Sequence, residues 1–279
     1  YGGTRLHEEE EEGGRGRHAG HCGPARPACQ GGARTRWAPA AGRAIVTGMA
    51  TDGIGPASRA GADALLVDLD GVVRHFDPAF VADLERRHGL AGGAILAAAF
   101  EEDLLGQVTT GRITRAEWVA TVGAGIGAPA AAEAWGSMPA TVDEQVLAIV
   151  DDVRATGLPV AVLTNGTDTI PDELDALGIT DRFDAVFNSA EIGHTKPDAR
   201  AFAPACDAPL LPPGRVAFTD DSPAKLAGAV ALGMPAHLFT GAAGLRAWLE
   251  GLRVLAPEPS PGAGPGGRRP DRPPPGRAR

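Results

Sequence analysis

The chain is poor in cysteine and in long apolar runs, and each shortage excludes a class of protein. Three cysteines among 279 residues do not make the dense disulfide framework of a small secreted domain. No apolar stretch approaches the ~20 residues of a membrane-spanning helix, and the first residues lack the basic-then-apolar order of a secretory signal. We therefore expect a cytoplasmic protein with no membrane partner.

Basic residues are also scarce relative to acidic ones. The chain has 26 Lys and Arg against 35 Asp and Glu, a formal net charge of −9. A protein that binds nucleic acid needs clustered Lys and Arg to replace the counterions of the phosphates. The composition therefore favours a small-molecule substrate and no nucleic acid partner. The hydrophobic fraction of 43% is sufficient for a globular core.

Both ends of the chain lack hydrophobic periodicity. Residues 1–60 mix five consecutive glutamates with Gly, Arg, Pro and Ala, and residues 254–279 are rich in Pro, Gly and Arg. Such segments bury too little apolar surface to offset the entropy of ordering, so we predict that both are disordered. The chain starts at Tyr1, whereas Met49 comes shortly before the globular part. We hypothesise that the natural start is Met49.

Between these ends, short β-type runs alternate with helical patterns, which is typical of βαβ units around a parallel sheet. The expected strands cover residues 64–67, 159–163, 185–187, 216–218 and 236–239. The expected helices cover about 143–156, 170–177, 199–206, 223–232 and 243–252. We predict an α/β core domain made of residues 61–77 and 141–253.

Residues 78–140 break this alternation, because they carry apolar residues at helical spacing and no convincing strand. We predict an all-helical insert here. Thr114 with Glu117, and Thr141 with Glu144, have the spacing of a capping box, so a helix is expected to begin at each. The apolar stripe around Trp118 is interpreted as the core of the insert rather than as a binding site.

Polar side chains follow four of the expected strands. They are Asp68, Asp70, Thr164, Asn165, Lys196, Asp220 and Asp221. The carboxyl ends of parallel strands meet at one edge of a sheet, where ligands bind in α/β proteins, so these residues can converge on one pocket. Each motif alone can be a turn or a helix entry. Their combination, in this order, indicates a functional site.

These residue types suit the hydrolysis of a phosphate monoester, a slow reaction whose charged transition state needs positioned cations and donors. Asp68 and Asp220, with Asp221 nearby, can hold Mg²⁺, a hard cation that prefers oxygen ligands. Asp68 is the predicted nucleophile and forms an aspartyl-phosphate. Asp70 lies two residues later on the same side of an extended chain, so we predict that it protonates the leaving oxygen and then deprotonates water.

Two more residues complete the predicted machinery. The hydroxyl of Thr164 can donate to a phosphoryl oxygen, and Lys196 can offset the charge of Asp68 and of the phosphate. Asn165 and Gly166 directly follow Thr164 and are predicted to contact the substrate.

The motifs resemble those of the haloacid dehalogenase superfamily. Its four motifs are matched in order by residues 68–73 (Asp-Leu-Asp-Gly-Val-Val), 163–166 (Leu-Thr-Asn-Gly), 193–198 (Gly-His-Thr-Lys-Pro-Asp) and 218–221 (Phe-Thr-Asp-Asp). The resemblance covers about residues 62–252. It implies a Rossmann-like three-layer core with a small helical cap, residues 78–140, inserted after the first motif. It also implies that the backbone carbonyl of Asp70 joins Asp68 and Asp220 around Mg²⁺.

Two departures within the superfamily bear on the chemistry. The true 2-haloacid dehalogenases lack an aspartate at the position of Asp70 and use no metal, so the resemblance implies a phosphatase-type enzyme. Relatives with a Phe-x-Asp-Asp fourth motif often carry Asn where this chain has Lys225. Lys225 is either a second cation near the acidic cluster or a lysine on an exposed helix face.

Substrate selection in this superfamily comes from the cap and from the loop after the first motif. Arg74 and His75 occupy that loop, and they either reach the distal group of a substrate or form a solvated turn. Glu101, Glu102 and Asp103 form an acidic cluster in the insert that either lines the cleft or faces water.

The sequence thus predicts a Mg²⁺-dependent hydrolase of a small phosphorylated metabolite, such as a sugar phosphate. A sugar phosphomutase would use the same aspartyl-phosphate, and a catalytically silent binding module would keep the same fold. A silent module has no need of the complete set of predicted catalytic residues. Substrate identity and oligomeric state are left open.

Overall fold

A computed structural model describes residues 61–257, all of which belong to one compact unit. The predicted disorder of residues 1–60 and of residues 258 onward lies outside the described residues, as does the hypothesis about Met49. Val254 and Leu255 are buried against the core, so the packed chain extends beyond the predicted boundary at residue 253. Within residues 61–257, no helix has the length and apolar character needed to cross a bilayer.

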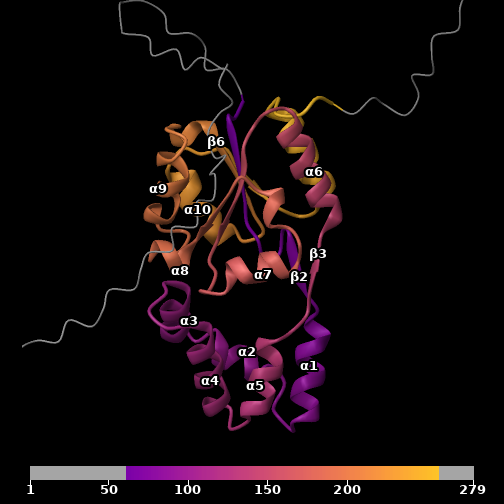
Figure 1. The fold of residues 1–279 in the computed structure, drawn as a ribbon, viewed down its shortest axis with the longest axis vertical. Helices are drawn as coiled ribbons and strands as arrows, with labels where there is room; N and C mark the ends of the chain where they lie inside the picture. Colours follow the sequence, from indigo (N-terminus) through magenta and orange to yellow (C-terminus); the bar gives the residue numbers. More distant parts are fainter. Residues whose placement is uncertain (1–60, 258–279) are drawn as a thin grey trace, which may run out of the picture. The chain divides into compact units, whose positions relative to one another are not determined.

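Five parallel strands form the central sheet, in the order β5-β4-β1-β6-β7 (Figure 1). They are β1 (Ala64–Val67), β4 (Val160–Thr164), β5 (Ala185–Asn188), β6 (Val216–Asp220) and β7 (Ala236–Leu238). All four residues of β1 are buried, as a central parallel strand covered on both faces requires. All five predicted strands are confirmed.

Helices cover both faces of this sheet (Figure 1). Leu65 and Val67 of β1 pack in the cluster that includes α6 (Glu144–Ala155), α7 (Ile170–Ala176) and α11 (Ala242–Gly251). Leu66 points to the other face and packs with α9 (Ala199–Asp207) and α10 (Pro223–Ala231), because successive side chains of a strand alternate between faces. Three shorter helices complete the core: α8 (Ser189–Ile192), η1 (Thr180–Arg182) and η2 (Pro213–Arg215). The structure confirms the three-layer α/β architecture.

Five helices occupy residues 78–136, and we call this segment the helical insert. They are α1 (Pro78–Arg87), α2 (Ala94–Ala99), α3 (Glu102–Thr109), α4 (Arg115–Gly125) and α5 (Pro129–Gly136). The insert has an apolar cluster of its own, in which the rings of Trp118 and Trp135 meet edge to face with centroids 4.9 Å apart. The prediction that Trp118 belongs to this core is confirmed.

The two predicted capping boxes have different outcomes. The hydroxyl of Thr114 accepts the N–H of Glu117 while the Glu117 carboxylate accepts the N–H of Thr114, so the first box forms. The second does not form, because Thr141 lies in a strand and Asp143 caps α6 by accepting backbone N–H groups of its first turn.

Two short strands at the borders of the helical insert were not predicted from the sequence. β2 (Arg74–Phe76) and β3 (Ala140–Val142) form an antiparallel pair in which His75 lies opposite Thr141. A strand of three residues is too short to show a periodic pattern, and its partner lies on the far side of the insert in the sequence. This ribbon connects the insert to the end of β1.

Candidate active site

The predicted residues converge where β1, β4 and β6 end. Asp68 directly follows β1, Thr164 is the last residue of β4 and Asp220 is the last residue of β6. All three are at most 1% exposed. Because β1 pairs in parallel with both neighbouring strands, their carboxyl ends lie at the same edge of the sheet. The short apolar runs that form these strands therefore bring distant polar residues together.

The buried ammonium group of Lys196 forms ion pairs with two of these carboxylates. Its Nζ lies 2.8 Å from Asp68 Oδ1 and 2.7 Å from Asp220 Oδ2, and it donates to the backbone oxygen of Leu163 at 2.7 Å. Since a lysine ammonium has three donors, this geometry engages all of them. Lys196 therefore holds Asp68 and Asp220 at a fixed separation.

Asn165 holds Lys196 in turn. Its side-chain amide donates to the backbone oxygen of Lys196 at 3.0 Å, and its Oδ1 accepts the backbone N–H of Lys196 at 2.8 Å. The next residue must be Gly166, because a Cβ there would lie 2.4 Å from Ile170 Cγ1. The motif after β4 thus positions the lysine that follows β5.

Lys225, from α10, adds a second ammonium group. Its Nζ lies 3.0 Å from Asp68 Oδ2 and 3.8 Å from Asp220 Oδ1. Burial alone would lower the pKa of Lys225, but the neighbouring carboxylates outweigh burial and raise it. Of the two interpretations left open by the sequence, the structure supports a second cation at the acidic cluster.

The two buried aspartates titrate in opposite directions. Burial alone would raise the pKa of Asp68, but Lys196 and Lys225 outweigh burial and lower this pKa below its ordinary value. Burial raises the pKa of Asp220 to about 6, because Lys196 offsets it only in part and the charge of Asp68 adds to it. Asp68 is therefore the member of the pair that favours the ionised form.

A third carboxylate completes an acidic cluster. Oxygen atoms of Asp68, Asp220 and Asp221 all lie within 4.8 Å of one another, which is close enough for one metal ion to contact them all. Gly71 permits this approach, because a Cβ at its position would lie 2.1 Å from Asp221 Oδ2, and its φ of +89° also favours glycine.

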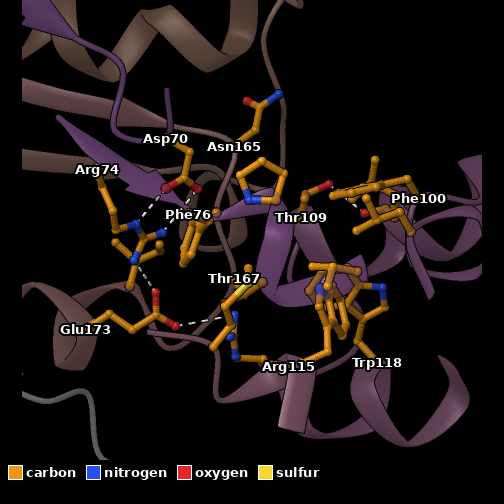
Figure 2. A pocket seen from close by; sticks show the side chains of 18 of the residues that line it. Asp70, Arg74, Phe76, Phe100, Thr109, Arg115, Trp118, Asn165, Thr167 and Glu173 are labelled. Carbon is orange, nitrogen blue, oxygen red and sulfur yellow. Dashed lines mark hydrogen bonds and ion pairs between the residues drawn. The ribbon is translucent and has the colours of Figure 1, made fainter. Parts of the chain in front are cut away.

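The carboxylate of Asp70 is bound by Arg74. Arg74 Nε lies 2.6 Å from Asp70 Oδ1 and Nη2 lies 3.1 Å from Oδ2, while Nη1 donates to Glu173 Oε2 at 2.5 Å (Figure 2). Burial alone would lower the pKa of Arg74, but the two carboxylates outweigh burial and raise it. Arg74 is 4% exposed, so two acidic side chains compensate a buried guanidinium.

A cavity of about 320 Å³ opens beside Asp70 (Figure 2). Residues of the helical insert and of the strand-end loops line it, and they include Arg74, Asn165 and Gly166. His75 is not among the lining residues. Its Nε2 lies 3.7 Å from Asp143 Oδ2, since neighbouring side chains of β2 point in opposite directions. The structure therefore brings Arg74 to the cavity and leaves His75 outside it.

Sequence reasoning missed several parts of this wall. Glu173 lies in the first turn of α7. The sequence around it does not indicate a role in the site, because its contact with Arg74 forms only in the folded chain. Trp118 and Trp135 line the cavity as well as packing in the insert, a double role that the apolar stripe did not indicate. The acidic residues 101–103, whose position the sequence left open, are exposed and are not lining residues.

Comparisons with known proteins agree with the topology. Residues 62–233 match the family model of haloacid dehalogenase-like hydrolases. A solved haloacid dehalogenase (HAD) family enzyme from Bacteroides thetaiotaomicron, in complex with magnesium and inorganic phosphate, is 21% identical with a TM-score of 0.54, over 63% of this chain and 93% of that chain. A predicted HAD-like family hydrolase from Porphyromonas gingivalis is 21% identical with a TM-score of 0.51, over 63% and 90%. No curated protein matches the sequence.

Proposed function

The chain belongs to the family of haloacid dehalogenase-like hydrolases, and we propose that it is a Mg²⁺-dependent phosphatase that acts on a small phosphate monoester. The observation that carries this proposal is the cluster of Asp68, Asp220 and Asp221 at the strand ends, with Lys196 in contact with the first two. This arrangement offers a carboxylate nucleophile together with groups that offset the charge of a phosphoryl group.

In the proposed reaction, Asp68 attacks phosphorus. The bond between phosphorus and the alcohol oxygen breaks as the bond to the Asp68 carboxylate forms, which gives an aspartyl-phosphate. Water then attacks phosphorus, so that inorganic phosphate leaves and the carboxylate is restored. The contacts of Asp68 with two ammonium groups support its ionised form, which attack requires. Thr164 and Lys196 are the proposed partners of the phosphoryl oxygens.

Asp70 is the proposed acid and base. It gives a proton to the alcohol oxygen in the first step and takes one from the attacking water in the second. The side chain of Asp70 forms a bidentate pair with Arg74, which holds it in place. Asp70 also lines the cavity, so it is accessible to a ligand bound there.

The acidic cluster fits Mg²⁺, because this ion prefers oxygen ligands and three carboxylates lie within 4.8 Å of one another. Asp68, Asp220 and Asp221 are the proposed side-chain ligands, and the backbone carbonyl of Asp70 is the fourth protein group. Bound there, the ion supplies positive charge next to the phosphoryl oxygens. The ammonium of Lys225 already contacts Asp68, so Lys225 competes with the metal for the same carboxylate.

Release of inorganic phosphate tests the proposal. We expect release from p-nitrophenyl phosphate and from other monoesters with Mg²⁺, and little release when EDTA removes the metal. Asp68→Asn should lower kcat by about 10⁴-fold or more, because the nucleophile is lost. Asp83→Asn is the matched control, since Asp83 lies partly exposed on α1 and pairs only with arginines of that helix.

Three results would contradict the proposal. They are full activity in Asp68→Asn, equal phosphate release with and without metal, and isomerisation of a sugar phosphate without release of phosphate. The third would identify a phosphomutase.

A further inference from the structure

The cavity beside Asp70 has mostly apolar walls. Aromatic and aliphatic side chains from the helical insert, from the residues just after it, from β2 and from α7 line the cavity: Phe76, Phe100, Trp118, Trp135, Met138 and Ile170. Figure 2 shows Phe100 and Trp118 on one side of the cavity, and Asp70, Arg74 and Glu173 on the other. A volume of about 320 Å³ lies at the lower end of the range for small-ligand pockets, so the matching ligand group is compact.

Apart from the indole N–H of Trp135, the charged and polar side chains of this wall are already engaged within the protein. Arg74 Nη1 lies 2.5 Å from Glu173 Oε2, and Arg115 Nη1 lies 3.4 Å from Glu173 Oε1. The indole N–H of Trp118 donates to a backbone carbonyl of α2 at 3.0 Å. Hydrogen bonds to the protein also engage four further polar side chains of the wall, which are Asp77, Thr109, Asn165 and Thr167.

Because these polar groups already have partners in the protein, the cavity discriminates between polar and apolar substrate groups. The hydroxyl groups of a sugar would lose hydrogen bonds to water on entering the cavity and would have to compete with existing protein pairs for new ones. An apolar group loses no hydrogen bond and gains contact with aromatic rings and with the thioether of Met138. The cavity wall therefore favours an apolar group.

The cavity adjoins the strand-end site through two of its lining residues, Asp70 and Asn165. Asp70, the proposed acid for the alcohol oxygen, is part of its wall. Asn165, also in the wall, is hydrogen-bonded to Lys196, which in turn contacts Asp68. An ester whose phosphoryl group meets Asp68 therefore directs its alcohol half toward the aromatic residues.

We propose that the cavity binds the alcohol half of the substrate and that this half is a compact aromatic or branched aliphatic group rather than a sugar. This inference rests on the proposed phosphatase function. It names the class of ester that the site selects.

A matched pair of esters tests the inference. 2-Phenylethyl phosphate and glucose 6-phosphate are both esters of primary alcohols, so their leaving oxygens are chemically similar. We expect kcat/KM for 2-phenylethyl phosphate to exceed that for glucose 6-phosphate by about 100-fold. An equal or higher kcat/KM for glucose 6-phosphate would overturn the inference.

A substitution at the cavity tests its location. Phe100 is 54% exposed, so Phe100→Ala removes a ring from the wall at little cost to folding. We expect this variant to lower the preference for 2-phenylethyl phosphate by about 10-fold. Val230→Ala is the control, because Val230 is an exposed apolar residue of α10 and is not among the lining residues. An unchanged preference in Phe100→Ala would contradict the assignment.

Binding without hydrolysis separates this inference from the proposed function. 3-Phenylpropylphosphonate keeps the shape of 2-phenylethyl phosphate but has no ester bond, and methylphosphonate lacks the apolar group. With Mg²⁺, we expect calorimetry to give at least about 10-fold tighter binding of the phenylpropyl compound. Tighter binding without hydrolysis of any ester would reject the phosphatase function and retain the cavity. Hydrolysis of the esters together with equal affinity for both phosphonates would retain the phosphatase function and reject the assignment of the cavity.

Discussion

The strand-end site and the cavity meet at Asp70, and their charged groups are arranged differently. At the strand ends, Asp68 and Asp220 are buried beside Lys196 and Lys225, with three of the four ion pairs at 2.7 to 3.0 Å. These charges are concentrated, and the carboxylates outnumber the ammonium groups once Asp221 is included. This strand-end site is suited to a charged phosphoryl group and a cation.

The cavity has charged side chains too, but four of them neutralise one another along its wall. Arg74 and Arg115 both contact Glu173, and Arg74 also binds Asp70. The remaining wall is largely aromatic and aliphatic. Under the proposed function, the two regions would recognise the two halves of an ester by opposite means, charge for the phosphoryl group and apolar contact for the alcohol.

Among the effects that compare the two regions, the largest concerns Asp70, which belongs to both. Asp70→Asn should lower kcat for 2-phenylethyl phosphate by about 10³-fold, because an alkoxide leaves poorly without a proton. The loss for p-nitrophenyl phosphate should be smaller, since p-nitrophenolate leaves without protonation. Steady-state kinetics with both esters measure the difference. Equal losses would contradict the role of Asp70 as the acid.

The next effect concerns the buried charge of the strand-end site. Lys196→Met should lower the free energy of unfolding by about 3 kcal/mol, because two buried carboxylates lose their shared cation. Lys225→Met should cost about 1 kcal/mol, since this side chain is 28% exposed and Lys196 remains in place. Urea unfolding followed by circular dichroism measures both. Equal losses would show that burial does not distinguish the two lysines.

A smaller effect tests the competition between Lys225 and the metal. Lys225→Asn should bind Mg²⁺ about 10-fold tighter, a gain of about 1.4 kcal/mol, because a positive charge next to Asp68 is removed. Lys225→Arg keeps the charge and should show no such gain. Calorimetric titration with Mg²⁺ measures both affinities. An unchanged affinity in Lys225→Asn would rule out the competition.

The smallest effect separates the stability of the helical insert from the chemistry. Thr114→Ala should lower the free energy of unfolding by about 1 kcal/mol, because the capping box at the start of α4 is lost. Thr114→Ser should retain most of this stability. Thermal unfolding measures both, and kcat/KM for p-nitrophenyl phosphate should stay unchanged. A large loss of activity in Thr114→Ala would mean that α4 positions the reacting groups.

Much of the strand-end site could be predicted because its signals are local. β1 is a buried apolar run directly followed by Asp68, and β6 ends in Asp220. A parallel sheet then brings these ends to one edge whatever the loops between them do. Lys196 and Asn165 could be assigned to the same edge for this reason, although their mutual hydrogen bonds could not.

The cavity was far less predictable. Arg74 appeared in the sequence as a candidate substrate contact, but its guanidinium is shared between Asp70 and Glu173, which is 99 residues away. His75 was an equal candidate and lies outside the cavity, because the three residues of β2 pair with a strand that the sequence did not reveal. Such outcomes depend on a register that folding decides.

By itself, the sequence determined the parallel α/β core and the edge at which Asp68 and Asp220 lie, because each of them stands at the end of its own apolar run. Only the tertiary structure decided which cation each carboxylate contacts and what the cavity wall offers to a ligand. The physical reason is the sequence separation of the residues on which each feature depends. Strand formation depends on a few neighbouring residues, whereas a buried ion pair or an aromatic wall depends on side chains that only the folded chain brings within a few ångströms.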